Sequence, residues 1–365
     1  MSSIAIIGGG IVGLSIAWQS AQRGLRVTVF DQATIGGEAS WAGAGMLAPG
    51  GEVVQHSELA CFAIESRNQY SRFVRELEQA AKTRIDYQDC GALDLAYSQA
   101  ELEILEARVA VQDRLGIPSK SITADEVRSF WPRVRTEALV GARFYPGDGL
   151  VNPRDVVDAL ATACADLGVT LVPHYGIQNI DLGSDRAVLN GMQEMTFDAA
   201  VISAGAWSSS ISVYDALGNL DPLPASEPVK GHLIGYWQPL HTCNTMIRRG
   251  HFYLLQRASG LLIAGASVER VGFDRSILAE RVNELRAEAA FVLPHLAETE
   301  PSEMWIGFRP ASERLQIGPW KTSPLYLAYG HYRNGILLAP LTADRIADQL
   351  KHGTAEVVRK SDPPR

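Results

Sequence analysis

Near its N-terminus the chain reads Ile4-Ala5-Ile6-Ile7-Gly8-Gly9-Gly10-Ile11-Val12-Gly13, and Val27-Thr28-Val29-Phe30-Asp31 follows. This order predicts a strand, a Gly-x-Gly-x-x-Gly turn, a helix and a second strand ending on an acid, which is the βαβ unit that binds dinucleotides. Gly8 allows the tight turn, Gly10 lets the backbone approach a pyrophosphate, and Gly13 lets the helix pack close to the sheet. Because a helix N-terminus offers free N–H groups and a partial positive charge to phosphates, we expect a dinucleotide here.

The acid at the end of the second strand extends this prediction to the ribose. Asp31 lies 18 residues after Gly13, where a carboxylate can accept hydrogen bonds from an adenosine ribose. NAD and FAD share this fingerprint, so it leaves the choice between them open.

Length and charge limit the class of protein. The 365 residues exceed what one hydrophobic core usually supports, so we expect two domains. A formal net charge of −8, without any run of Lys or Arg, argues against a nucleic acid or an anionic membrane as partner. There is neither a secretory pattern nor an apolar run long enough to be an integral membrane segment, so we predict a cytoplasmic protein.

The four cysteines are Cys61, Cys90, Cys164 and Cys243. They are far apart and show no Cys-x-x-Cys spacing, which argues against a metal site and against a disulfide framework. Buried free thiols are the favoured interpretation, and we predict no metal ligands.

Hydrophobic periodicity and turn residues predict the order of the elements. Helices are expected at Leu14–Arg23, Leu59–Ala81, Ala100–Leu115, Asp155–Leu167 and Ile277–Phe291, with a last helix from about Pro340. Strands are expected at Val169–Val172, Phe197–Ser203 and Leu325–Tyr329. Between Pro222 and Gly272, short β-rich runs separated by turn residues predict a largely antiparallel sheet.

The predicted fold is therefore α/β, with a Rossmann-type nucleotide-binding domain and an inserted α+β substrate domain on the antiparallel sheet. The nucleotide-binding domain is expected to be discontinuous, over residues 1–85, 140–220 and 300–365. The substrate domain would comprise residues 86–139 and 221–299.

Three segments outside the dinucleotide motif carry further signals. Gly36–Leu47 consists mostly of small residues; on composition alone a flexible surface loop is favoured, although such a backbone could also lie against a large flat cofactor. Gly330–Ile336 leads into Pro340, which fits a helix start that could stabilise negative charge on a reduced cofactor. Arg309, between a glycine and a proline in Trp305–Pro310, is placed to present a fixed fork to a carboxylate, although an ordinary surface arginine is an equal alternative.

These segments together resemble the D-amino-acid oxidase-related family of FAD-dependent amine oxidases, and within it the members that oxidise glycine in the thiamine pathway. The resemblance rests on Gly8–Gly13, Asp31, Ala39–Leu47, Val201–Trp207, Gly307–Pro310 and Gly330–Pro340. It covers essentially the whole chain. Some relatives bind flavin covalently through a cysteine near the Arg309 region, but no cysteine follows Cys243, so the resemblance implies non-covalent FAD.

The resemblance also implies site residues. Arg309 would bind the substrate carboxylate with the help of the Tyr253 hydroxyl, and Arg333 would lie near the flavin and the substrate. The residues expected at FAD are Gly8, Gly10, Ile11, Val12, Gly13, Asp31, Gln32, Ala39, Ser40, Ala44, Gly45, Met46, Ile177, Ala204, Gly205, Trp207, His331, Tyr332, Arg333, Asn334, Gly335, Ile336 and Leu337. Val268 stands where the family usually carries methionine, which leaves the substrate selectivity open. For His331 and His251 a structural histidine is the favoured interpretation.

The implied reaction is oxidative deamination of glycine, sarcosine or small D-amino acids, by hydride transfer from Cα to flavin N5. It would give a 2-oxo acid, ammonia and, from molecular oxygen, hydrogen peroxide. The open alternatives are a related oxidase or dehydrogenase for D-proline, sarcosine or another D-amino acid, an NAD-dependent dehydrogenase, the flavin domain of a tRNA-modifying enzyme, and a non-catalytic nucleotide-binding module. The resemblance further implies a homo-oligomer.

Overall fold

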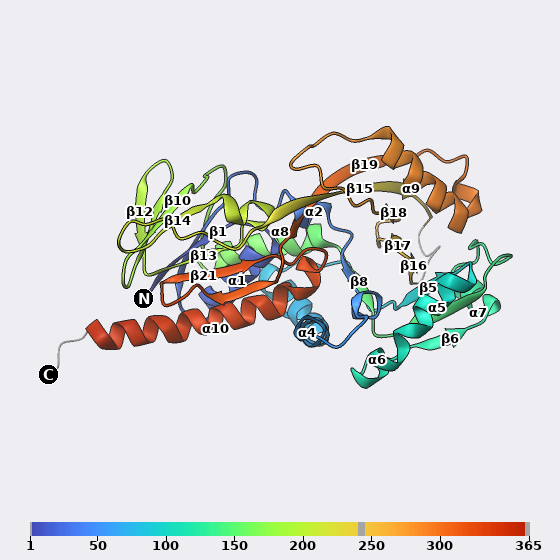
Figure 1. Cartoon of the computed structure of the whole chain (residues 1–365), viewed down its shortest axis with the longest axis horizontal. Helices are drawn as coiled ribbons and strands as arrows, with labels where there is room; N and C mark the ends of the chain where they lie inside the picture. The colour runs from blue at the N-terminus through green and yellow to red at the C-terminus, as the bar shows by residue number, and fades with distance from the viewer. Residues whose placement is uncertain (1, 240–244, 362–365) are drawn as a thin grey trace.

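A computed structural model describes residues 2–239 and 245–361, with side chains as far as residue 353. The first βαβ unit lies at the centre of a six-stranded sheet (Figure 1). In spatial order the strands are β20 (Gln316–Pro319), β21 (Leu325–Tyr329), β13 (Ala199–Ile202), β1 (Ser3–Ile7), β2 (Arg26–Phe30) and β9 (Thr170–Val172). All neighbours are parallel except β20 and β21, so the carboxyl ends of β1 and β2 reach the same edge of the sheet.

Alternate residues of β1 pack on two different layers, because successive side chains of a strand point to opposite faces. Ile4 and Ile6 belong to a core shared with helices, whereas Ala5 and Ile7 face a four-stranded sheet. The helices are α1 (Ile11–Gln22), α4 (Glu58–Ala81), α8 (Pro153–Asp166) and α10 (Gly335–Ser361). The four-stranded sheet has the order β12 (Glu194–Phe197), β11 (Ala187–Asn190), β10 (Asn179–Leu182), β14 (Ser212–Tyr214).

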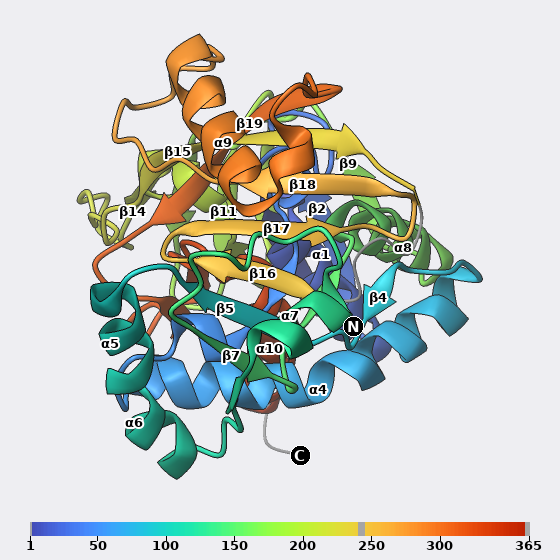
Figure 2. The same cartoon turned by 90° about the vertical axis from the view of Figure 1, so that its right-hand side faces the viewer.

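The second large sheet has eight strands and faces the viewer in Figure 2. Its order is β19 (Glu303–Ala311), β15 (Glu227–Trp237), β18 (Leu261–Gly265), β17 (Phe252–Gln256), β16 (Met246–Arg249), β5 (Ala92–Ala96), β7 (Gly141–Tyr145), β6 (Lys120–Ile122). Only β16 and β5 pair in parallel, so the prediction of a largely antiparallel sheet is confirmed. The domain boundaries stay a prediction, and β7 and β19 lie in ranges that it assigns to the nucleotide-binding domain.

The eight-stranded sheet is covered on one face and meets the nucleotide-binding elements on the other. Its first face packs against α9 (Ala279–Val292) and α7 (Ala124–Phe130). Its second face packs against Ala42, Ala44 and Ala48. The remaining short elements are α2 (Ala39–Ala42), β3 (Met46–Leu47), α3 (Pro49–Glu52), β4 (Tyr87–Gln88), β8 (Gly149–Val151), η1 (Gly205–Ser210) and η2 (Pro294–Leu296).

The predicted helix over Ala100–Leu115 is wrong as a single element. It is divided into α5 (Gln99–Ala107) and α6 (Val109–Arg114). The break falls at Arg108, whose side chain turns inward to the carboxylate of Asp94. The break thus coincides with an ion pair between Arg108 and Asp94, in a segment whose periodicity is helical throughout.

The predicted start of the last helix near Pro340 is also wrong. Helix α10 begins at Gly335, and the Leu338 N–H donates to the Asn334 carbonyl at 2.8 Å, so the first turn forms before the proline. Pro340 lies inside the helix, and the Thr342 hydroxyl lies 3.1 Å from Nε2 of His331.

The interpretation of the cysteines as buried free thiols holds only in part. The described cysteines are free, but Cys61 is exposed, Cys90 is partly buried and Cys164 is buried. Cys243 lies outside the described residues. Within residues 2–239 and 245–361, none of the helices combines the length and the apolar character that crossing a membrane requires.

Candidate active site

One cavity lies between the two large sheets and collects most of the predicted site residues. It is lined by Gly8 and Asp31 of the first βα unit and by Tyr253, Arg309 and Arg333. The other predicted residues that line it are Gly10, Ile11, Val12, Gln32, Ala39, Ser40, Ala44, Gly45, Met46, Ile177, Ala204, Gly205, Trp207, His331, Tyr332, Asn334, Gly335 and Ile336. Gly13 and Leu337, which are also predicted at FAD, do not line the cavity.

Both exceptions have a packing role. A Cβ on Gly13 would lie 1.9 Å from the Gly8 carbonyl oxygen, so this glycine is needed where α1 approaches β1, as its motif predicts. Leu337 is buried in the core beneath α10, and its carbonyl accepts the Ser66 hydroxyl at 2.7 Å. Both residues therefore pack beneath the residues that line the cavity.

The turn after β1 has no room for side chains. Gly8 has a φ of +109°, and a Cβ there would lie 2.4 Å from the Ser203 carbonyl oxygen. The Asp31 carboxylate accepts the backbone N–H groups of Gly9 and Ala33, each at 2.8 Å. Asp31 therefore fixes the shape of the glycine turn, in addition to facing the cavity.

The small-residue segment Gly36–Leu47 is ordered, so the composition-based interpretation as a flexible surface loop is wrong. It contains α2 and β3, and the Ser40 hydroxyl accepts the Ile11 N–H at 2.9 Å. Gly45 has a φ of +89°, and a Cβ there would lie 1.9 Å from the Val151 carbonyl oxygen. The backbone of this segment thus approaches both α1 and β8 closely.

The segment Gly36–Leu47 is also held by Arg257, a buried arginine that was not predicted from the sequence. The Arg257 guanidinium donates to the carbonyls of Gly43 (3.4 Å), Ala44 and Val151. Burial lowers the pKa of Arg257 to about 10. Nothing in the local sequence distinguishes Arg257, because its partners are backbone groups more than 100 residues away.

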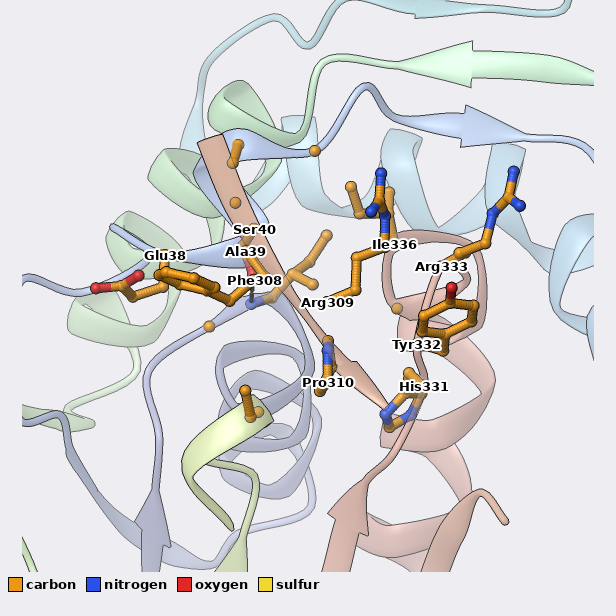
Figure 3. Close-up of a pocket in the computed structure, with 18 of the residues that line it drawn as sticks. Glu38, Ala39, Ser40, Phe308, Arg309, Pro310, His331, Tyr332, Arg333 and Ile336 are labelled. Atoms are coloured by element: carbon orange, nitrogen blue, oxygen red, sulfur yellow. Dashed lines mark hydrogen bonds between the residues drawn. The ribbon is translucent and has the colours of Figure 1, made fainter. Parts of the chain in front are cut away.

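Arg309 projects from β19 into the cavity (Figure 3). Its guanidinium lies over Gly231 of β15, where a Cβ would be 2.4 to 2.6 Å from Nη2, Nη1 and Cζ. Nη1 donates to the backbone carbonyls of Ser267 (3.0 Å) and Lys230 (3.4 Å). Burial lowers the pKa of Arg309 below its ordinary value. Because a guanidinium titrates far above neutral pH, the side chain still carries its full charge.

Tyr253 and Arg333 complete this part of the cavity. Tyr253 of β17 is buried, which raises the pKa of its phenol, and its hydroxyl lies 2.5 Å from the place of a Cβ on Gly265. Arg333 lies in the turn before α10, and its Nη2 is 3.3 Å from a carboxylate oxygen of Glu52. Figure 3 shows Arg309 between the β19 ribbon and the turn that carries Tyr332 and Arg333.

The two histidines differ in their surroundings. His331 is buried beside the cavity and its Nε2 lies 3.1 Å from the Thr342 hydroxyl, which agrees with a structural histidine. Burial lowers the pKa of His331 to about 4, so it is neutral at physiological pH. His251 lines the cavity but is exposed, as is Val268.

Sequence reasoning missed several further residues at the cavity. Glu52 is the carboxylate partner of Arg333, and Gly231 is the platform beneath Arg309. Phe308, next to Arg309, packs edge-on against Trp207 with ring centroids 6.2 Å apart. A glycine within a strand and a glutamate at the end of a short helix carry no local signal of such contacts.

The glycine-lined half of the cavity fits a dinucleotide. Its walls are backbone, since Cβ atoms at Gly8 and Gly45 would collide with other backbone atoms. The helix α1 points its N-terminus toward it, and Gly10 carries no side chain that could occupy the space in front. This is the arrangement that places phosphates at a helix N-terminus.

The chain belongs to the FAD-dependent oxidoreductase family, whose sequence profile matches residues 3–349. FAD is therefore the cofactor, and the predicted fold class and enzyme class are confirmed. The sequence is 32% identical to glycine oxidase of Geobacillus kaustophilus over 359 residues, covering 94% of this chain and 92% of that protein. A crystal structure of glycine oxidase from Geobacillus kaustophilus superposes with a TM-score of 0.88 at 31% identity, over 96% of this chain and 95% of that one.

Two further similarities show how far the likeness extends. The bifunctional protein ThiO/ThiG of Synechocystis is 32% identical over 95% of this chain, which spans about half (51%) of that longer protein. The iminodiacetate oxidase structure from Chelativorans has a TM-score of 0.85 at 25% identity, over 96% of this chain and 95% of that one.

Proposed function

We propose that this protein catalyses the oxidative deamination of glycine, and of sarcosine or small D-amino acids. In the net reaction glycine, water and oxygen give glyoxylate, ammonia and hydrogen peroxide. The observation that carries the proposal is the state of Arg309. Within the described residues its guanidinium donates to two backbone carbonyls and pairs with no carboxylate, although it faces the cavity. A buried cation without a counter-ion is a site for an anionic ligand.

The residues of the cavity would divide the work between cofactor and substrate. The turn at Gly8, the segment around Ser40 and Gly45, and the turn before α10 would hold FAD, which supplies a two-electron acceptor when bound. Arg309 and the Tyr253 hydroxyl would bind the substrate carboxylate and so fix the position of Cα. Arg333, already paired with Glu52, would stand beside them.

No strong general base is needed in this proposal. The amino acid would bind as the free amine, and catalysis would depend on placing Cα against the acceptor in a site from which water is excluded. His331 is not available as a general base, because its low pKa keeps it a weak base and its Nε2 is hydrogen-bonded to Thr342. The glycine oxidase names of the similar proteins support the same substrate class.

The test is anaerobic addition of glycine to the purified holoenzyme while flavin absorbance is followed. Prompt bleaching that reverses on admitting air, with hydrogen peroxide formed, is the expected result. A flavin spectrum that glycine, sarcosine, D-proline and D-alanine all leave unchanged would refute the proposal. Bleaching that air fails to reverse would keep the substrate class and exclude oxygen as the acceptor.

The proposal also covers the location of the enzyme, its assembly and the attachment of FAD. We propose a cytoplasmic location and a homo-oligomeric assembly, together with non-covalent FAD. Size-exclusion chromatography with light scattering measures the assembly. Release of the flavin into the supernatant on acid precipitation tests the non-covalent attachment.

A further inference from the structure

Arg309 can offer only one of its edges to a ligand. A guanidinium has five N–H donors, two of them on Nη1. Among the described residues, Nη1 donates to the carbonyls of Ser267 and Lys230, whereas Nε and Nη2 donate to no protein group. One face of the group is closed by the backbone at Gly231. The free edge is therefore the pair Nε–H and Nη2–H, which matches the two oxygens of a carboxylate.

Both carbonyls that hold Nη1 belong to a hydrogen-bonded group behind the cavity. The Ser267 hydroxyl accepts the backbone N–H of His232 (2.9 Å) and donates to Oε1 of Glu269 (2.6 Å). Lys230 and Glu269 exchange backbone hydrogen bonds at 2.9 and 3.0 Å. The position of Nη1 is thus coupled to the position of Glu269.

The Glu269 carboxylate is held in turn by His232. Nδ1 of this fully buried histidine lies 2.8 Å from Oε1 of Glu269. Its Nε2 lies 3.0 Å from the backbone nitrogen of Leu278 and accepts that N–H, which leaves Nδ1 as the nitrogen that faces Glu269. On the other side, Nε of Arg281 is 3.6 Å from Oε2 of Glu269.

We propose that Glu269 is a positioning residue for the carboxylate clamp, acting through Ser267 on Nη1 of Arg309. The inference rests on the proposed function, because it assumes that Arg309 binds the substrate carboxylate. Glu269 does not itself line the cavity. Its carboxylate fixes the loop from Ser267 onward, and this loop turns the Nε–Nη2 edge of Arg309 toward the substrate.

The test compares Glu269→Gln with the matched control Glu284→Gln. Glu284 is an exposed carboxylate that pairs with the same Arg281 at 2.7 Å, so the control removes one charge from the same neighbourhood without reaching Ser267. The probe is acetate, a carboxylate without an amine, titrated against the oxidised holoenzyme by the change in flavin absorbance. Steady-state kinetics with glycine and the FAD content are measured alongside.

We expect Glu269→Gln to raise both the acetate Kd and the glycine KM about tenfold, because a charged acceptor behind the clamp is lost. The value of kcat and the FAD content should stay within about twofold, and Glu284→Gln should leave all four quantities unchanged. A merely structural role would lower FAD content and kcat together with acetate affinity, and that result would overturn the proposal. An unchanged acetate Kd would overturn it as well.

A second variant keeps the test decisive if Glu269→Gln does not fold. Ser267→Ala retains the carbonyl that accepts from Nη1 of Arg309 but loses the hydroxyl that is bonded to Glu269. The acetate Kd of this variant should therefore rise about threefold. No rise in the acetate Kd would refute the coupling. Acetate binding needs no turnover. If wild-type holoenzyme binds acetate but glycine leaves it oxidised, the proposed function fails, while the effect of Glu269 is still measured. Wild-type holoenzyme that is bleached by glycine but does not bind acetate would overturn this inference and leave the proposed function standing.

Discussion

Placing one methyl group beneath Arg309 should separate clamp geometry from folding. Gly231 is in a regular strand and its φ lies outside the left-handed region, so alanine suits the backbone there. The added Cβ would be 2.4 Å from Nη2. An ordinary contact is at least 3.4 Å, so the guanidinium has to move by about 1 Å. A misplacement of that size costs about 100-fold in rate, or about 2.7 kcal/mol of transition-state stabilisation.

The assay is oxygen consumption with glycine, alongside FAD content and the midpoint of thermal unfolding. We expect Gly231→Ala to lower kcat/KM about 100-fold with full FAD and little change in Tm, because the group that must move is the flexible end of a side chain. Gly147→Ala is the matched control, since a Cβ there meets no atom within 4 Å. If kcat/KM of Gly231→Ala stays within about threefold of wild type, Arg309 does not bind the substrate in the position described.

Arg309→Lys should retain FAD but raise the glycine KM about 100-fold, because a point charge replaces a fork; kinetics insensitive to this change would contradict the clamp. Gly45→Ala should lower the FAD content and destabilise the protein by about 2 kcal/mol in urea unfolding, since φ there is +89° and the Cβ would strike the Val151 carbonyl. The pKa of His331 is about 4 in the folded protein, so the free energy of unfolding of the wild type should fall as the pH drops from 6.5 to 4. In that range the imidazole of the unfolded chain binds a proton, whereas the buried imidazole stays unprotonated. His331→Gln should remove up to about 3 kcal/mol of that loss, and equal slopes for both proteins would refute the assignment.

Short-range patterns made the nucleotide half of the cavity predictable. The glycines at positions 8, 10 and 13 serve one local turn, and the interactions that need them lie within the first βα unit or the strand next to it. The sequence around Gly307 and Pro310 drew attention to Arg309, but only the family resemblance favoured a substrate-binding role over an ordinary surface arginine. In both cases the signal in the sequence is local, although Gly8 packs against Ser203 and Arg309 against Gly231, which lie far away in the chain.

Most of the remaining errors arise where distant segments meet, whereas the start of α10 is a local error. Composition favoured a loop at Gly36–Leu47, but that segment is ordered by β8 and by Arg257, which are contributed from elsewhere in the chain. The start of α10 was misplaced because Pro340 is tolerated inside a helix whose first turn already forms at Asn334. Glu269 and Gly231 could not be identified from the sequence, because their contacts depend on the pairing of β15 with β19 and on the loop after β18.

The pairing of β15 with β19 explains how the α2 segment and Arg309, the proposed carboxylate clamp, are held at a fixed distance from each other. Gly231 and Gly307 lie directly opposite each other, so both lack a side chain on the same face of the sheet. A Cβ on Gly307 would lie 2.6 Å from the Cβ of Ala42 in α2, whereas one on Gly231 would strike Arg309. The side-chain-free surface at Gly231 and Gly307 therefore leaves room for both the α2 segment and the Arg309 guanidinium. The α2 segment lines the glycine-rich half of the cavity. Because both contacts are made to the same two paired strands, a shift of this ribbon would move the α2 segment and the clamp together, which preserves the alignment on which the proposed oxidation depends.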